Sequence, residues 1–175
     1  MANDGKFVNI DSATGLQKQE LAINTSAGAG DAAKIARLDA SGRWDPSMMP
    51  VGIVAETMTI VASEALAAGA LVNIWSNAGV LSARNADGSA AGKPADGFVL
   101  SAVANAANAL VYLEEAMITG LSGLTLGSDA FLSTTVAGAI TNTIPTGAGK
   151  VAQQVGKALS ATTILFRPRV AITLA

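Results

Sequence analysis

The chain has 175 residues, of which half are hydrophobic and 14% are charged, and its net charge at pH 7 is −2. This length is enough for one well-buried domain with an appended arm, while a free monomer usually carries nearer a quarter charged residues. The basic residues are scattered and form no stripe that could neutralise a phosphate backbone. We therefore expect no nucleic-acid partner, and a surface that neighbouring subunits partly cover.

The chain contains no cysteine and no histidine. Disulfides, thiolate or imidazole metal sites and Ser-His-Asp or Cys-His catalytic systems are thereby excluded. Glu114 and Glu115 are adjacent, so on a strand they point to opposite faces. Asp87, Asp96 and Asp129 could assemble a glycosidase-type pair from a distance, but each lies in a predicted turn. We expect no enzymatic activity, no cofactor and no metal, and leave open Ser, Thr or Lys nucleophiles that need no histidine.

Residues 1–50 are poor in apolar side chains and rich in Gly, Ser, Asp and Asn, which predicts an extended N-terminal arm. Its start is polar and acidic, unlike a signal peptide, and the uncharged segments 65–83 and 130–149 are too interrupted to span a membrane. Residues 34–45 predict a short β-hairpin that turns at Asp39–Gly42. The alternative is a short helix over 31–38 that is capped by Asp31.

Residues 51–175 alternate short apolar or Thr-rich runs with Gly, Asn and Asp turns, which predicts an all-β domain, a sandwich or a barrel. We expect its strands at residues 58–62, 71–75, 80–83, 98–104, 109–114, 130–133, 139–143, 151–155 and 162–167.

An internal repeat divides this domain into two similar β-modules, at about residues 62–115 and 120–168. Laid over each other without a gap, Gly97, Val99, Val103 and Leu113 match Gly149, Val151, Val155 and Leu165. Upstream, Leu-Ala-Ala-Gly at 66–69 matches Leu-Thr-Leu-Gly at 124–127. Each module is too small to bury its apolar face alone, so the two should pack together. Chance agreement between common Gly and Ala residues is the alternative.

Several strings resemble the decoration (cement) proteins of tailed-phage capsids, and the related head-fibre proteins. Residues 38–50 read Leu-Asp-Ala-Ser-Gly-Arg-Trp-Asp-Pro-Ser-Met-Met-Pro, and residues 62–74 read Ala-Ser-Glu-Ala-Leu-Ala-Ala-Gly-Ala-Leu-Val-Asn-Ile. Residues 95–99, Ala-Asp-Gly-Phe-Val, and 151–158, Val-Ala-Gln-Gln-Val-Gly-Lys-Ala, continue the likeness, which covers residues 34–168.

This resemblance implies a structural virion protein, made in the host bacterial cytoplasm, that binds the outside of the capsid. It implies a homo-oligomer, usually a trimer, whose partner is the major capsid protein and which stabilises the expanded shell. A head-fibre, neck or tail component is the second reading, and a carbohydrate-binding module is the third.

Six apolar residues of the arm are our candidates for contact with the capsid or with a neighbouring copy. For Trp44 and the two methionines the alternative is that they plug the base of the chain's own barrel. The candidates are Phe7, Val8, Ile10, Trp44, Met48 and Met49.

Overall fold

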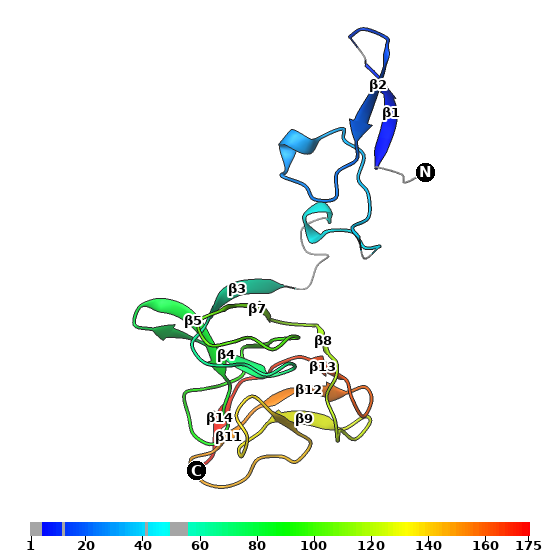
Figure 1. The fold of residues 1–175 in the computed structure, drawn as a ribbon. Coiled ribbons are helices and arrows are strands. Elements are labelled where there is room, and N and C mark those ends of the chain that lie inside the picture. Colours follow the sequence, from blue (N-terminus) through cyan, green and yellow to red (C-terminus); the bar gives the residue numbers. More distant parts are fainter. Residues whose placement is uncertain (1–4, 12, 41, 50–55) are drawn as a thin grey trace. The chain divides into compact units, whose positions relative to one another are not determined.

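The computed structural model describes residues 5–11, 13–40, 42–49 and 56–175. The chain forms two compact units, Met1–Val54 and Ala55–Ala175, and each is described by itself. The expected boundary between residues 50 and 51 lies outside the described residues. Figure 1 shows short strands throughout, and the protein is all-β.

The N-terminal unit is built on one antiparallel hairpin of strands β1 (Lys6–Ile10) and β2 (Gln17–Leu21). Two single turns of 3-10 helix follow, η1 (Ala29–Asp31) and η2 (Pro46–Met48). Beyond the hairpin, an isolated parallel bridge joins Ile23 to Ala36.

The hairpin expected at residues 34–45 is wrong, because the strands lie earlier in the chain. A turn does form there, where the Gly42 N–H donates to the Asp39 carbonyl at 3.0 Å. After the turn, however, the chain enters the 3-10 turn at Pro46 instead of a returning strand. The alternative helix over 31–38 is also wrong, since Ala33 adopts a φ of 65° that no right-handed helix allows.

The first module of the main unit is a closed barrel with the order β3-β5-β4-β6-β7. Neighbours pair antiparallel except β3 and β5, which are parallel and close the barrel through Val61–Ser82 and Ala62–Ala83. The strands of this barrel module are β3 (Thr57–Ala62), β4 (Leu71–Asn77), β5 (Val80–Asn85), β6 (Gly97–Phe98) and β7 (Asn108–Tyr112).

The second module is an open antiparallel sheet with the order β10-β9-β12-β13-β8. A separate pair, β11 (Val151–Ala152) and β14 (Ile172–Thr173), brings in the C-terminal segment. The strands of this open module are β8 (Met117–Ile118), β9 (Asp129–Leu132), β10 (Ile140–Thr141), β12 (Gln154–Ala158) and β13 (Ile164–Phe166).

The two modules share one strand order. The strands correspond in chain order, so that β3, β4, β5, β6 and β7 match β8, β9, β10, β12 and β13 respectively. With this match the two modules have the same neighbours, except that the pair equivalent to β3 and β5 is not formed in the open sheet. Hydrogen bonds match as well: Gly69 N–H donates to Val99 O at 2.8 Å, and Gly127 N–H to Ala158 O at 2.9 Å. That the modules arose by duplication stays a prediction.

The hydrogen bonds correct part of the expected alignment between the modules. The Val99 carbonyl accepts from Gly69 in the first module as the Ala158 carbonyl accepts from Gly127 in the second, so Val99 corresponds to Ala158. Two residues earlier, Gly97 therefore corresponds to Gly156 and not to Gly149. A Cβ on Gly97 would lie 2.6 Å from the Tyr112 carbonyl oxygen, and one on Gly156 would collide with the Leu165 carbonyl. Both glycines therefore let the neighbouring strand approach closely.

Two apolar clusters form the core of the main unit. One lies inside the barrel, around Val72, Val99 and Val111. The other spans both modules: Leu71 and Phe98 of the barrel pack with Phe166 and Ile164 of the open sheet. The Phe98 and Phe166 rings meet edge to face, with centroids 5.2 Å apart.

Every strand expected in the main unit overlaps an observed one, with corrections in length. The expected strand 98–104 stops at Phe98, and the expected strand 151–155 divides into β11 and β12, which join different sheets. Sequence reasoning missed β8 and β14, which have only two residues each and so show no alternation.

Candidate functional site

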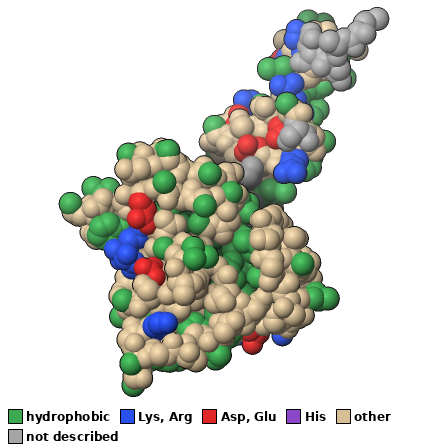
Figure 2. All heavy atoms as spheres, turned by 60° about the horizontal axis from the view of Figure 1, so that its bottom comes forward, with side chains coloured by type: hydrophobic (Ala, Val, Ile, Leu, Met, Phe, Trp, Pro, Cys, Tyr) green, Lys and Arg blue, Asp and Glu red, His purple; other side chains and the backbone are tan. Residues whose placement is uncertain are grey.

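The N-terminal unit has almost no core of its own. Ala22, at 7% exposure, is the one buried residue among those described in this unit. A unit of this size that buries so little apolar surface gains little free energy from folding alone. Most of its large apolar side chains are instead at the surface, and those at least 40% exposed are Val8, Ile10, Leu16, Leu21, Ile35, Leu38, Trp44 and Met49. Apolar side chains are visible over this unit in Figure 2.

Three apolar side chains, Val8, Ile10 and Leu21, lie on one face of the hairpin together with Lys6, Gln17 and Gln19. In its register Lys6 faces Leu21, Val8 faces Gln19 and Ile10 faces Gln17, so these side chains share one face. Val8 is 60% and Ile10 65% exposed. We call Val8, Ile10 and Leu21 the hairpin apolar face. A two-stranded hairpin is only marginally stable in water, so these uncovered apolar side chains are a candidate contact surface.

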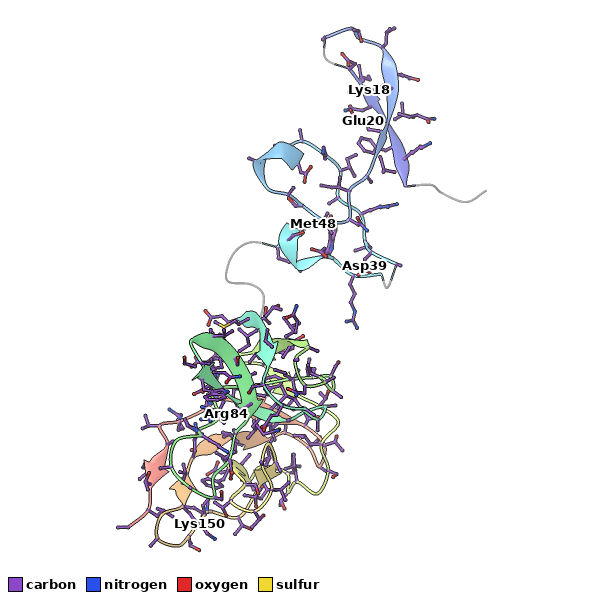
Figure 3. The ribbon with its side chains drawn as sticks, turned by 60° about the vertical axis from the view of Figure 1, so that its left-hand side comes forward. Lys18, Glu20, Asp39, Met48, Arg84 and Lys150 are labelled. Carbon is purple, nitrogen blue, oxygen red and sulfur yellow. The ribbon has the colours of Figure 1, made fainter. Side chains whose placement is uncertain are left out.

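Charges gather on the other face and in the turn of the hairpin. Lys18 Nζ lies 2.6 Å from Glu20 Oε1 and 3.8 Å from Asp11 Oδ2, and Figure 3 shows Lys18 and Glu20 side by side. The pKa of Glu20 is lowered, chiefly by its hydrogen bond with Lys18 and also by one from Asn9. Phe7 lies on this face, opposite Glu20, and is half-buried. The hairpin is thus two-sided, with polar pairing on one side and uncovered apolar groups on the other.

The other three candidates lie together around η2. Asp45 organises this turn, since its Oδ1 accepts the Ser47 N–H at 2.9 Å and the Ser47 hydroxyl at 2.6 Å. These bonds lower the pKa of Asp45, the one from the Ser47 side chain most. Trp44 is 48% and Met49 40% exposed, whereas Met48 is half-buried.

The structure therefore places the six candidates in two groups, on the hairpin and around η2. In Figure 3 Met48 lies well away from Lys18 on the hairpin. Phe7 and Met48 are less exposed than the other four, which makes Val8, Ile10, Trp44 and Met49 the better contact candidates. Sequence reasoning missed Leu16 and Leu21, at 69% and 57% exposure, because the strand Gln17–Leu21 is mostly polar and showed no apolar alternation.

In the main unit the most connected polar cluster surrounds Arg84. Its Nε donates to Asn73 Oδ1 at 2.9 Å, its Nη2 donates to the Gly92 carbonyl at 2.9 Å, and its guanidinium lies 4.3 Å from the centre of the Trp75 ring. The Asn73 amide in turn donates to Asp96 Oδ2 at 2.8 Å. These bonds fasten the loop before β6 onto the barrel, so the cluster has a structural role.

The three carboxylates expected in turns also have partners, although Asp129 begins strand β9 and does not lie in a turn. Asp87 Oδ1 accepts the Ser89 N–H at 2.9 Å, and bonds to Ser89 lower the pKa of Asp87. Asp96 accepts the Ile74 N–H, and Asp129 lies 3.8 Å from Lys157 Nζ. In the described part of the chain no three His, Cys, Asp or Glu side chains gather where they could hold a metal ion. Among the same residues, no helix has the length and apolar character to cross a membrane.

Comparisons with protein-family models, with curated proteins and with solved structures found no match for this chain.

Proposed function

We propose that this chain is a structural virion protein that binds the outside of a phage capsid as a symmetric oligomer and stabilises the expanded shell. One observation carries the proposal: the N-terminal unit exposes most of its large apolar side chains and, in its described part, buries only Ala22. Such a unit gains stability when another surface covers it, and a capsid shell or a neighbouring copy offers that surface. The resemblance of residues 34–168 to decoration proteins supports the capsid as partner.

The two units divide this work between them. The barrel and open sheet share a continuous core and supply a rigid body, while the hairpin apolar face and Trp44 supply contact. A protein that binds only the assembled shell stabilises it by its own binding free energy, which adds up over many copies. Catalysis has no part in this proposal.

The copy number in purified virions, measured by quantitative mass spectrometry against the major capsid protein, tests the proposal. A decoration protein should approach the copy number of the capsid protein. A handful of copies per particle would instead assign the chain to a head fibre, neck or tail. Its absence from virions would overturn any virion role.

A further inference from the structure

The open module lacks the strand pair that closes the barrel module. In the barrel, β3 pairs in parallel with β5. Their counterparts β8 and β10 are the two outer strands of the open sheet and do not pair with each other. The same strand order therefore produces one closed and one unclosed module.

The hydrogen bonds locate the positions where closure is missing. In the barrel the Leu113 N–H donates to the Glu56 carbonyl, and in the open sheet the Phe166 N–H donates to the Ala116 carbonyl, each at 2.9 Å. Glu56 therefore corresponds to Ala116. Five residues further along each strand, Val61 corresponds to Leu121. On the other outer strand, Ala83 pairs with Ile74 in the barrel, and Ile140 pairs with Leu132 in the open sheet, so Ala83 corresponds to Ile140. The counterparts of the closing pairs are therefore Leu121 with Ala139, and Ser122 with Ile140.

A groove of about 390 Å³ lies at these positions. Residues 120–122 and 136–140, the loop 67–70, Asn85 and Leu124 line it. No lining residue carries a charge, and most are Ala or Gly, so a backbone could approach closely. We call this the closure groove.

We propose that the closure groove receives the C-terminal strand of a second copy of this chain, which pairs as an added β-strand. Strand addition to an open sheet edge is a common mode of recognition, with backbone hydrogen bonds supplying affinity. The occupant should be uncharged, because an ion buried against this lining would lose its hydration without a partner. This requirement disfavours β1 and β2, which carry Lys6, Lys18 and Glu20.

The C-terminal segment, residues 170–175, meets the requirement. It contains no charged side chain, and Val170 and Ile172 are 85% and 61% exposed. Its strand β14 is paired along one edge only, to β11. None of these residues lines the groove of its own chain, so the donor must be another copy.

This contact is head-to-tail, since a groove on one copy meets a strand on the next. Head-to-tail contacts generate closed rings when the rotation between copies allows it, and a trimer is the smallest such ring. The inference thus deepens the oligomeric part of the proposed function and rests on it, but it makes no use of the capsid.

Cross-linking tests the contact directly, because the chain has no native cysteine to interfere. Full-length Ser122→Cys and Ile172→Cys variants are mixed and oxidised, and a covalent dimer should form in the mixture but with neither variant alone. Mixing Val80→Cys with Ile172→Cys is the matched control, since Val80 is 58% exposed and lies outside the groove. A yield no higher than in the control would overturn the inference. A cross-link of Ser122→Cys to Val8→Cys instead would assign the groove to the hairpin of the next copy and likewise overturn it.

Oligomer mass measured by light scattering supplies a second readout. Val170→Asp should weaken self-association at least about tenfold, because it places a charge against the uncharged lining, whereas Val80→Asp should not change it. A monomeric wild-type protein, or an unaffected Val170→Asp oligomer, would contradict the contact. If cross-linking fails while virions still carry the chain at high copy number, only the groove contact is refuted and the proposed function stands.

Discussion

At the residue scale, the Arg84 side chain connects the Asn73 side chain, the Gly92 carbonyl and the Trp75 ring. Asn73 is 4% exposed, and its side-chain oxygen accepts from Arg84 Nε. Removing the guanidinium leaves that buried oxygen without this donor and uncovers the Trp75 ring. A buried polar group left without its partner costs about 1–3 kcal/mol.

We therefore expect Arg84→Ala to lower the free energy of unfolding by about 1–3 kcal/mol, measured by chemical denaturation. Arg167→Ala is the matched control: Arg167 pairs with Glu115 at 3.2 Å, but their side chains are 56% and 69% exposed. An exposed ion pair contributes at most about 1 kcal/mol, so this control should change stability little. Equal effects of the two substitutions would contradict the structural role given to Arg84.

Asp11 predicts a pH dependence of the hairpin. Its carboxylate accepts the N–H groups of Thr14 and Ala13, which lower the pKa of Asp11 below the ordinary value for Asp. A lowered pKa in the folded state means that the ionised form stabilises the turn. This stabilisation is present at neutral pH and is lost as the pH falls below the ordinary Asp value and through the folded pKa.

Site-resolved NMR titration should give Asp11 a pKa below the ordinary value for Asp, and the protection factors of the hairpin amides, which correct for the intrinsic pH dependence of exchange, should fall over the same acid range. The Asp11→Asn variant, which cannot ionise, should lose that part of the pH dependence. An ordinary pKa for Asp11 would contradict the turn geometry.

At the element scale, the sequence predicted the longer strands of the barrel well, but it predicted the short strand β6 and the ends of the sheets poorly. Strands 58–62 and 71–75 have apolar and Thr-rich character that persists over several residues, and both were placed within a residue or two. Two-residue strands such as β8 and β14 are set by hydrogen bonding to distant partners, for which a local pattern carries no signal. The same holds for Gly97, whose counterpart Gly156 follows from the hydrogen bonds that Val99 and Ala158 accept.

Among the candidate contact residues, too, some show a local sequence pattern and others depend on a distant pairing partner. Val8 and Ile10 alternate along β1, and this pattern is visible in the sequence. Leu21 joins them through the register of the hairpin, which places it opposite Lys6 and could not be known before β2 was placed. That Trp44 and the methionines take part in capsid binding stays a prediction.

The hairpin apolar face predicts a change in binding without a change in folding. The double variant Val8→Thr, Ile10→Thr keeps β-branched side chains on the strand but replaces buried apolar contact in the complex with hydroxyl groups. We expect roughly tenfold or weaker binding to expanded shells, since about 1–2 kcal/mol of apolar burial is lost. Binding can be measured by co-sedimentation of the protein with shells.

Asn9→Thr is the control, because Asn9 lies between these residues and points to the opposite, charged face. It should leave binding within a factor of two or three. Deleting residues 1–30 should lower binding at least as much as the double variant. Unchanged binding of the deletion variant would overturn the role of the hairpin.

At the scale of the whole molecule, one core joins the two modules of the main unit. Phe98 of the barrel is fully buried against Phe166 of the open sheet. Gln153 adds a polar link, with its side chain accepting from the Ala95 N–H at 2.7 Å and donating to the Ala95 carbonyl at 2.9 Å. Neither module should therefore unfold without the other.

Phe98→Ala should destabilise the main unit by about 3–5 kcal/mol and keep a single unfolding transition, because the cavity opens in the shared core. Circular dichroism and Trp75 fluorescence, recorded in a Trp44→Phe background, should give coincident transitions. Phe131→Ala, at a half-buried position on β9, should cost less. Two separate transitions would show that the modules are independent.

Hydrogen exchange measured by mass spectrometry on the free and the shell-bound protein shows which segments the shell covers. We expect that amides of β1, β2 and the segment around Trp44 exchange quickly in the free protein and become protected on the shell, while the barrel is protected in both. Protection that is unchanged in the N-terminal unit on binding would contradict the claim that this unit is the contact surface.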